Sequence, residues 1–540
     1  MSKFSKFSNK TIVNYRQFEE DQEVNFMAGI SYRVNPLSAL KLVAGSSIFG
    51  EPSYYRNSHN VPRYIEKLLP WEIKFDIDDS SSTTDIFVQV VDNSLNFDFK
   101  GTLDFAKELR HQYFMRLNPG LILVRAVMHK DRSSFTKEHG SYLREIGKNI
   151  ILRPDDITNQ FDLFMFFNKS KRGLPSILKR IWKDTLESTS RYQLNKYKTK
   201  SIIDIIRICH ASNENIDELM TTGKITVSDD EKTWENLRSE NLVWEQIFSK
   251  TYIPHMALLR NLRNIFQCQN TNKPGQEFLS SVLTQLQEGV ATGKQFPFRY
   301  YTAYNEINNS EIHFKGQILD SLEKCMDLSV QNFPKLNGKT ICLCDNSASA
   351  WRSFTSQYGK VTVSTIANLS SIITALQSDE GYVGVFGDKL SIKPVSQRNG
   401  ILNQLNETSK RGKEQGQCTE NGIWLFFSNA IAEKTWYDNI FIYSDMQAGH
   451  GGLYGTNAKE YQNYTIKNNY IDVLKLLQVY REKVNPKVNL FSVQVAGYNN
   501  SVVPENSYRT AILTGWTGKE VLYANYLNEF WEASENKAQD

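Results

Sequence analysis

The chain has 540 residues, of which 40% are hydrophobic and 12% aromatic, so about two to four domains with sizeable cores are expected. Its 63 Lys and Arg nearly balance its 59 Asp and Glu, so global charge points to no polyanionic partner, and any basic surface must be local. The first residues lack the apolar core of a signal peptide, and no stretch reaches the roughly 18 apolar residues of a membrane span. We therefore expect no secretory leader and no membrane partner.

Six cysteines are scattered along the chain and form no CxxC pair. Cys342 and Cys344 alternate along one apolar segment, so a strand would turn both thiols to the same side. In a chain of this size the pattern predicts buried, reduced thiols and an intracellular, cytoplasmic protein.

The first hundred residues have a mixed pattern. The run from Asp85 to Asp92 is apolar at its centre, and it is either a strand or a buried helical turn. The segment before it, Asp76 to Asp85, is acidic and rich in Ser and Thr, so we expect a solvated loop there.

From about residue 100 to residue 330 the apolar residues recur with a helical period. Leu174, Ile177 and Ile181 are one example, at spacings of i, i+3 and i+7. Pro154 and Pro254 stand near apparent helix starts, where a missing N–H costs little. Helices of about 10–18 residues joined by short loops predict stacked helix pairs in a solenoid-like arrangement.

From about residue 335 short apolar runs alternate with helical segments, which predicts a parallel, doubly wound α/β sheet. The predicted strands are 340–344, 381–386, 439–443, 488–495 and 510–513, with a helix over 470–483. The segment 332–339 is the expected linker. The predicted domains are therefore a mostly helical one over 1–334 and an α/β one over 335–540.

Hydroxyl and carboxylate side chains follow the first predicted strand. Asp345, Ser347 and Ser349 are spaced by two, so an extended loop would turn them toward one point. Asp445 follows another apolar strand, and ligands of open α/β sheets gather at the carboxyl ends of strands. Carboxylates with hydroxyls make a hard oxygen site suited to Mg²⁺. The alternative is that Asp345 caps the next helix, because Asp, Asn and Ser are favoured caps.

This arrangement resembles the metal-ion-dependent adhesion site of von Willebrand factor A domains, which uses DxSxS on a first loop, Thr on a second and Asp on a third. The resemblance implies a divalent metal ion, Mg²⁺ above all, held by Asp345, Ser347, Ser349, Thr419 and Asp445. It also implies that the last coordination position is left for a carboxylate of a partner. The residues around Thr419 depart from the family's GGTD, whereas Asp445 keeps the carboxylate of its TDN.

The chain also resembles the Ro autoantigen family, whose helical module is called TROVE. The segment from Pro254 to Leu262 is similar to the module's LLRNL motif, and Leu194 to Lys198 is similar to its TKYK helix. Arg110 to Leu121, Arg153 to Asp156 and Phe296 to Arg299 match in the family's order. The resemblance spans nearly the whole chain. It implies a ring of HEAT-like helical repeats, an α-solenoid, followed by a von Willebrand factor A-type domain.

For function, the resemblance implies an RNA-binding protein. Ro proteins bind single-stranded 3′ ends of misfolded non-coding RNAs in the ring's hole and small Y RNAs on the outer basic surface, and bacterial relatives associate with RNA-degrading exonucleases. A His that helps contact Y RNA in the family is absent here, where Ser201, Ile202 and Ile203 follow the TKYK-like segment. At the outer Y-RNA contact, this chain therefore departs from the family's pattern.

Local charge also points to an RNA partner. Residues 169–200 hold ten Lys and Arg against two acidic side chains, which suits phosphate neutralisation. The alternative is a solvated helix face, the commoner meaning of a charge run. Trp182, Tyr192 and Tyr197 are interleaved in this block; they either stack on RNA bases or pack in the core, and we expect them in the core. The residues predicted to bind RNA are Lys169, Lys171, Arg172, Lys179, Arg180, Lys183, Lys196, Lys198 and Arg260.

Arg260 has two interpretations: it either lines the ring's hole or is buried against a carboxylate. Two further functions also stay open. One is a protein-interaction scaffold whose metal site recruits a carboxylate-bearing partner, for example an exonuclease, and this function is compatible with RNA binding. The other is a metal-dependent hydrolase, but the sequence has no Ser-His-Asp order, no HExxH motif and no Cys/His metal spacing. We therefore expect an RNA-binding monomer that is not an enzyme.

Overall fold

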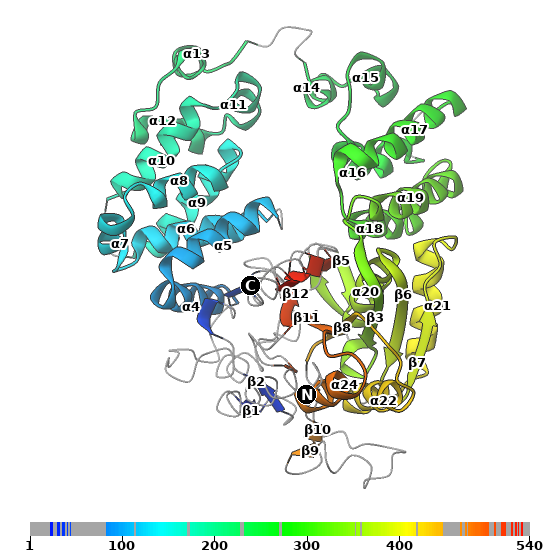
Figure 1. Ribbon diagram of the computed structural model, residues 1–540. Coiled ribbons are helices and arrows are strands. Elements are labelled where there is room, and N and C mark those ends of the chain that lie inside the picture. The colour runs from blue at the N-terminus through cyan, green and yellow to red at the C-terminus, as the bar shows by residue number, and fades with distance from the viewer. Residues whose placement is uncertain are drawn as a thin grey trace. The chain divides into compact units, whose positions relative to one another are not determined.

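The structure is a computed structural model, and it describes most of the chain between residues 83 and 446 together with shorter segments on either side (Figure 1). The described residues are 22–24, 30–32, 35–37, 40–41, 44, 83–112, 115–169, 173–226, 232–268, 273–351, 353–356, 359–416, 419–446, 465–466, 470–471, 473–495, 502–503, 509–514, 520–521, 524–525, 527–528 and 531–532. The chain divides into two compact units. The helical unit comprises Asn35–Glu51 and Ser58–Glu231, and the mixed unit comprises Met1–Val34, Pro52–Asn57 and Lys232–Asp540.

Stacked helices build the helical unit (Figure 1). Their bounds are α4 (Thr83–Phe97), α5 (Phe99–His111), α6 (Leu117–Met128), α7 (Arg132–His139), α8 (Tyr142–Ile150), α9 (Pro154–Phe167), α10 (Ser176–Glu187), α11 (Arg191–Tyr197), α12 (Lys200–Cys209) and α13 (Glu214–Thr222). α5 packs on α6 and α8, α6 packs on α9, and both α9 and α10 pack on α12. Leu121, Ile181 and Ile205 are fully buried between them. This is the stacking that the helical period predicted.

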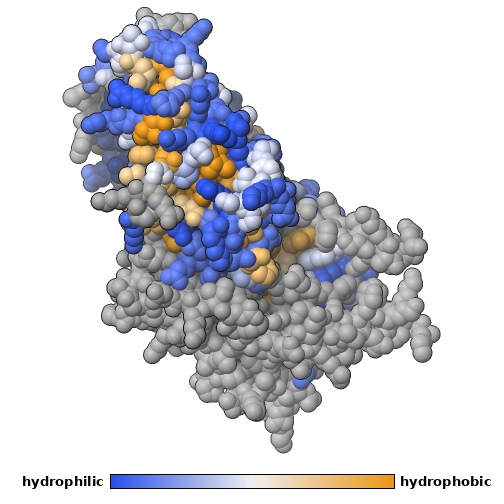
Figure 2. Space-filling view, turned by 90° about the vertical axis from the view of Figure 1, so that its left-hand side faces the viewer, coloured by the Kyte–Doolittle hydropathy of each residue, from blue (hydrophilic) through white to orange (hydrophobic). Residues whose placement is uncertain are grey.

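The helical unit has a mostly hydrophilic surface on one face, and its first described long helix is α4. The face seen in Figure 2 is mostly hydrophilic, with a strip of apolar residues running along the stack. α4 begins at Thr83, so the apolar run from Asp85 to Asp92 is helical rather than a strand. The predicted loop over 76–85 is wrong at its last three residues, and its earlier residues lie outside the described part of the chain.

In the described part of the mixed unit, six helices precede the sheet. They are α14 (Trp234–Ser239), α15 (Trp244–Lys250), α16 (His255–Phe266), α17 (Gln276–Gly293), α18 (Pro297–Asn308) and α19 (Lys315–Val330). α16 packs on α17 and α18, and both of these pack on α19, so the helical pairing continues along the chain. No helix in the described part of the chain is long and apolar enough to cross a membrane.

A six-stranded sheet follows, in the order β12-β11-β8-β3-β6-β7. Its strands are β3 (Leu336–Asp345), β6 (Ser378–Phe386), β7 (Leu390–Pro394), β8 (Asn439–Ser444), β11 (Asn489–Gln494) and β12 (Thr510–Thr514). Five of them run parallel, at the positions where strands were predicted. β7 is antiparallel to β6, so the prediction of a wholly parallel sheet was wrong at this edge. The segment 390–394 alternates and ends in a proline, so it contains no apolar run to reveal it.

Helices cover both faces of the sheet, as in a doubly wound fold. They are α20 (Val363–Leu376), α21 (Ile401–Lys413), α22 (Thr419–Ala432) and α24 (Val473–Lys483). α20 packs on β3 and β6, and its Thr374 hydroxyl lies 2.6 Å from that of Tyr443 on β8. α22 and α24 share a buried cluster with Ile341 and Leu343 of β3. Successive side chains of β3 thus enter two different cores.

Three short antiparallel pairs of strands are also present among the described residues. They are β1 (Gln22–Val24) with β2 (Ile30–Tyr32), β4 (Ser353–Ser356) with β5 (Gly359–Thr362), and β9 (Thr465–Ile466) with β10 (Tyr470–Ile471). The last pair lies where the start of a helix over 470–483 was expected, and the helix itself begins at Val473.

The predicted buried thiols are confirmed at Cys342 and Cys344, which are both free and fully buried on β3, but the prediction is wrong at Cys268, which is exposed. Burial raises the pKa of Cys344 to about 12, so its thiol stays protonated at neutral pH. The predicted boundary at 334/335 falls between α19 and β3, and it stays a prediction. Across it, Gln377 Nε2 donates to the carbonyl of Val330 at 2.7 Å, and the two compact units divide at Glu231 instead.

Candidate metal and nucleic-acid sites

The predicted metal ligands lie at the carboxyl ends of β3 and β8. These two strands are parallel neighbours, with Cys344 opposite Tyr443, so the residues that follow them reach the same edge of the sheet. Asp345 ends β3, and Asp445 follows β8 directly. Their exposed fractions are 0% and 1%, so both carboxylates are withdrawn from bulk water.

Hydroxyl groups connect the two carboxylates. Ser349 donates its hydroxyl to Asp445 Oδ2 at 2.9 Å, and the hydroxyls of Ser347 and Ser349 lie 3.3 Å apart. Asp345 accepts the backbone N–H of Ser347 at 2.9 Å through Oδ1 and the hydroxyl of Ser444 at 2.6 Å through Oδ2. The structure therefore brings together four of the five predicted ligands.

Hydrogen bonds of buried side chains hold the loop that carries these groups in place. Asn346 is fully buried and exchanges hydrogen bonds of 2.9 and 3.2 Å with Asn368 of α20. The indole N–H of Trp351 donates to the carbonyl of Asn346 at 2.9 Å. On the other strand, Met446 has a φ of 59°, a left-handed conformation that turns the chain sharply after Asp445. These contacts limit the freedom of the loop between Asp345 and Trp351.

Thr419, the fifth predicted ligand, is the first residue of α22, and its side chain lies outside the described part of the chain. No three His, Cys, Asp or Glu side chains gather as a metal site among the described residues. The cluster instead combines two carboxylates with two hydroxyls, a donor set that suits a hard divalent ion with retained waters. The Ser347 N–H bond to Asp345 forms a turn within the loop, whereas the next α-helix, α20, is capped by Thr362, so the interpretation of Asp345 as the cap of that helix is wrong.

The predicted RNA-binding residues of α10 differ in how far they are exposed. Arg180 is exposed, and Lys179 and Lys183 are half-buried, with Lys183 Nζ 3.6 Å from Glu187 Oε1. Trp182 of the same helix is fully buried, as predicted, and donates its indole N–H to Gln160 at 2.8 Å. The expectation that the three cations are exposed therefore holds fully only for Arg180.

The other predicted RNA-binding residues are dispersed. Lys169 follows α9, and Lys196 and Lys198, at the end of α11, are exposed. Lys171 and Arg172 lie outside the described residues. Arg260 is on α16 of the mixed unit and is exposed, so the interpretation that it is buried against a carboxylate is wrong.

The prediction that Tyr192 lies in the core was also wrong, because 46% of it is exposed. Tyr197 is half-buried. Lys196 lies over both rings, with Nζ 5.7 Å from the ring centroid of Tyr192 and 5.8 Å from that of Tyr197. α11 has only 7 residues, which is too short for its helical period to show which side is buried. The exposure of Tyr192 beside a cation therefore could not be predicted from the sequence.

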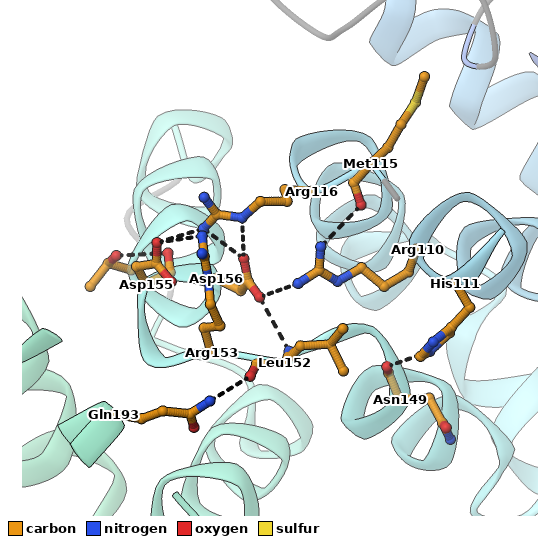
Figure 3. Close-up of polar contacts among 11 residues, drawn as sticks. Arg110, His111, Met115, Arg116, Asn149, Leu152, Arg153, Asp155, Asp156 and Gln193 are labelled. Atoms are coloured by element: carbon orange, nitrogen blue, oxygen red, sulfur yellow. Dashed lines mark hydrogen bonds and ion pairs between the residues drawn. The ribbon is translucent and has the colours of Figure 1, made fainter. Parts of the chain in front are cut away.

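Sequence reasoning missed a charged network, drawn in Figure 3, that we call the arginine ladder: Arg110, Asp156, Arg116, Asp155 and Arg153. Arg110 Nη2 lies 2.8 Å from Asp156 Oδ2. Arg116 Nη2 bridges Asp156 at 2.9 Å and Asp155 at 2.6 Å. Arg153 is the last member of the ladder, with Nη2 3.0 Å from Asp155 Oδ2. The segments 110–121 and 153–156 carried the family resemblance, and the ladder is what joins them.

The ladder runs from the core to the surface. The side chains of Arg110 and Asp156 are 7% and 4% exposed, whereas those of Arg116 and Arg153 are 37% and 35% exposed. Burial lowers the pKa of Arg110, and the charge of Asp156 opposes that shift. Three guanidinium groups face two carboxylates, so the ladder carries an excess of positive charge at its outer end.

Comparisons with known proteins agree with this architecture. Residues 218–382 match the family described as the TROVE domain. The Ro (RSR) protein of Deinococcus radiodurans is similar in structure, with a TM-score of 0.56 and 13% identity over 89% of this chain and 97% of that one. Telomerase protein component 1 of Mus musculus is 30% identical over 90 residues, which are 16% of this chain and 3% of that much longer protein.

These findings confirm the resemblance to the Ro and TROVE proteins. The likeness in structure shows the fold, which combines helical repeats with a von Willebrand factor A-like α/β domain, as the resemblance implied. Since TROVE is the helical module of the RNA-binding Ro proteins, the family match supports an RNA partner for this chain.

Proposed function

We propose that the chain is an RNA-binding protein of the Ro type. It would hold small Y-like non-coding RNA and single-stranded 3′ ends of misfolded RNA, and would act in RNA quality control or as a stable ribonucleoprotein. The group of Lys and Arg side chains on α10 and at the end of α11 is the observation that carries this proposal. The family match over residues 218–382 supports it independently.

The chemistry of this surface suits a polyanion. Arg180, Lys196 and Lys198 are exposed, so each can neutralise a phosphate at little desolvation cost. Lys179 and Lys183 are four residues apart and therefore lie on one side of α10. Contacts of this kind recognise the backbone rather than the bases, so we expect modest sequence preference and strong dependence on salt.

Charge reversal tests the proposal directly. The variant Lys179→Glu/Arg180→Glu/Lys183→Glu should bind a hairpin RNA with a single-stranded 3′ tail at least about tenfold more weakly, with a shallower dependence on salt. Binding is measured by fluorescence anisotropy over a salt series. A matched control carries Lys107→Glu, Lys130→Glu and Lys137→Glu, three exposed lysines elsewhere in the helical unit. Equal weakening of both variants would mean that net charge, and not this surface, binds the RNA.

We propose in addition that the loop from Asp345 to Ser349 binds a divalent ion, Mg²⁺ in the cell, and through it a carboxylate of a partner protein. The convergence of Asp345, Ser347, Ser349 and Asp445 at one strand edge supports this second function. The ion would supply a positive charge and open coordination positions, and these residues would orient it. An RNA-degrading exonuclease is one partner that fits an RNA quality-control role.

A further inference from the structure

The outer end of the arginine ladder has unused hydrogen-bonding capacity. Within the described residues, Arg116 bonds through Nε and Nη2, and Arg153 bonds through Nη2. The Nη1 group of each has no protein partner among them, although both side chains are more than one-third exposed. Asp155 and Asp156 hold the Arg116 guanidinium through two of its nitrogens, and Asp155 also holds Arg153 through Nη2, so the Nη1 groups stay available to a ligand. A planar guanidinium with a fixed direction is well suited to a phosphate.

An aromatic surface continues from this end. The guanidinium of Arg153 lies over the ring of Tyr197 at 5.4 Å, and Lys196 lies over both Tyr197 and Tyr192. α11 packs on α9, and Gln193 of α11 reaches the carbonyl of Leu152, the residue just before Arg153, at 3.5 Å. We call Tyr192 and Tyr197 the tyrosine pair. The ladder and the tyrosine pair are thus continuous on one side of the helical unit.

We propose that Arg116, Arg153 and the tyrosine pair form a binding site for one nucleotide of single-stranded RNA. Both guanidinium groups contact Asp155 (Figure 3), and Arg116 and Arg153 bind a phosphate through their Nη1 groups. The adjacent unpaired base stacks on Tyr192, the most exposed ring of the group, and Lys196, whose Nζ donates to the Tyr192 hydroxyl at 3.3 Å, is a second cation beside it. The site rests on the proposed RNA-binding function and adds to it a preference for unpaired RNA.

The preference follows from the chemistry of the two halves of the site. A phosphate is present in both single- and double-stranded RNA, so the ladder alone does not discriminate. A base offers its flat face to a protein ring only when it is unpaired and unstacked. The tyrosine pair therefore gains contact with single strands only.

The test uses the full chain and two labelled probes of about ten nucleotides, an oligouridylate and a blunt RNA duplex, with binding followed by fluorescence anisotropy. Tyr192→Ala should weaken oligouridylate binding by about tenfold, the effect of one lost stacking contact. Tyr192→Phe keeps the ring and should stay within about twofold of the unaltered chain. Neither change should alter duplex binding. Arg153→Gln should reduce the slope of log affinity against log salt for the oligouridylate by about 0.7.

Each outcome decides between the two proposals. If the unaltered chain binds the oligouridylate and Tyr192→Ala binds it equally well, the nucleotide site is wrong and the RNA-binding function stands. The same holds if Tyr192→Ala and Tyr192→Phe weaken binding alike, because a hydroxyl contact and not stacking would then be lost. Equal weakening for the duplex would remove the preference for single strands. An unaltered chain that binds neither probe would overturn the RNA-binding function, and this site with it.

Discussion

The arginine ladder and the strand-end cluster bury charge in different ways. In the ladder, Asp156 lies against Arg110 and Arg116, so the protein supplies its own opposite charges. At the strand edge, Asp345 and Asp445 are more deeply buried, and their described hydrogen bonds come from hydroxyl and backbone N–H groups. The ladder thus pairs its carboxylates with cations of the chain, whereas the strand edge combines two carboxylates with hydroxyls, the donor set on which the proposed divalent-ion site rests.

The sharpest test of the ladder removes its central carboxylate. Asp156→Ala should lower the free energy of unfolding of the helical unit by ~3–5 kcal/mol, because it leaves Arg110 buried without its ion pair. Urea unfolding followed by tryptophan fluorescence measures the loss. The matched control is Arg144→Ala, which breaks the more exposed ion pair with Asp184 and should cost no more than ~1 kcal/mol. Similar losses in the two variants would contradict a compensated buried network.

The corresponding test of the strand edge concerns a ligand rather than stability. Asp345→Ala should weaken Mg²⁺ or Mn²⁺ binding by at least about tenfold, because it removes a carboxylate from the oxygen donor set. Isothermal titration calorimetry measures the affinity, and RNA binding should stay unchanged. Glu414→Ala, a change at an exposed carboxylate just after α21, is the control and should bind the ion normally. Metal binding that survives Asp345→Ala would place the ion elsewhere or nowhere.

The third buried polar group is His255, which is not paired with a carboxylate among the described residues. Of the three groups, it is expected to have the smallest effect on stability. His255 is 5% exposed, its Nε2 lies 2.6 Å from the Tyr300 hydroxyl, and its Nδ1 has no partner among the described residues. Burial lowers the pKa of His255. Because the unfolded chain then takes up the proton more readily, the stability due to neutral His255 is complete above the unfolded-state pKa of about 6.5 and declines below it.

The expected slope below that pH is at most ~1.4 kcal/mol per pH unit. Urea unfolding of the unaltered chain and of His255→Gln, at about pH 7.5 and about pH 5.5, measures it. His255→Gln should lose less stability on acidification than the unaltered chain. His210→Gln, at an exposed residue that ends α12, should behave like the unaltered chain. An identical loss in all three would show that His255 is not responsible.

Much of the fold could be predicted because its signals are local. The strands around Cys342, Val383 and Phe441 are uninterrupted apolar runs, as expected of strands buried on both faces. β7 could not be predicted, because an edge strand needs no second apolar face and its alternating residues resemble a loop. The helix at Asp85 was ambiguous for a similar reason, since a short apolar run fits both periods.

The candidate sites also differ in how far the sequence could predict them. Asp345, Ser347 and Ser349 are close in sequence, so their convergence could be anticipated, and Asp445 followed from the rule that ligands gather at strand ends. Arg110 and Asp156 are 46 residues apart, and no pattern in one sequence pairs a particular arginine with a particular aspartate across that separation. The exposure of Tyr192 depends on what packs beside α11, which is likewise a tertiary property.

The antiparallel edge strand has one more consequence. β7 is the last strand on its side of the sheet, and it ends in Lys393 and Pro394. A proline has no N–H to offer another chain, and a lysine would be desolvated by an added strand, so this edge resists the strand-to-strand joining that leads to aggregates. Several copies gathered on one long RNA would be crowded together. An edge of this kind would let them remain separate molecules under that crowding.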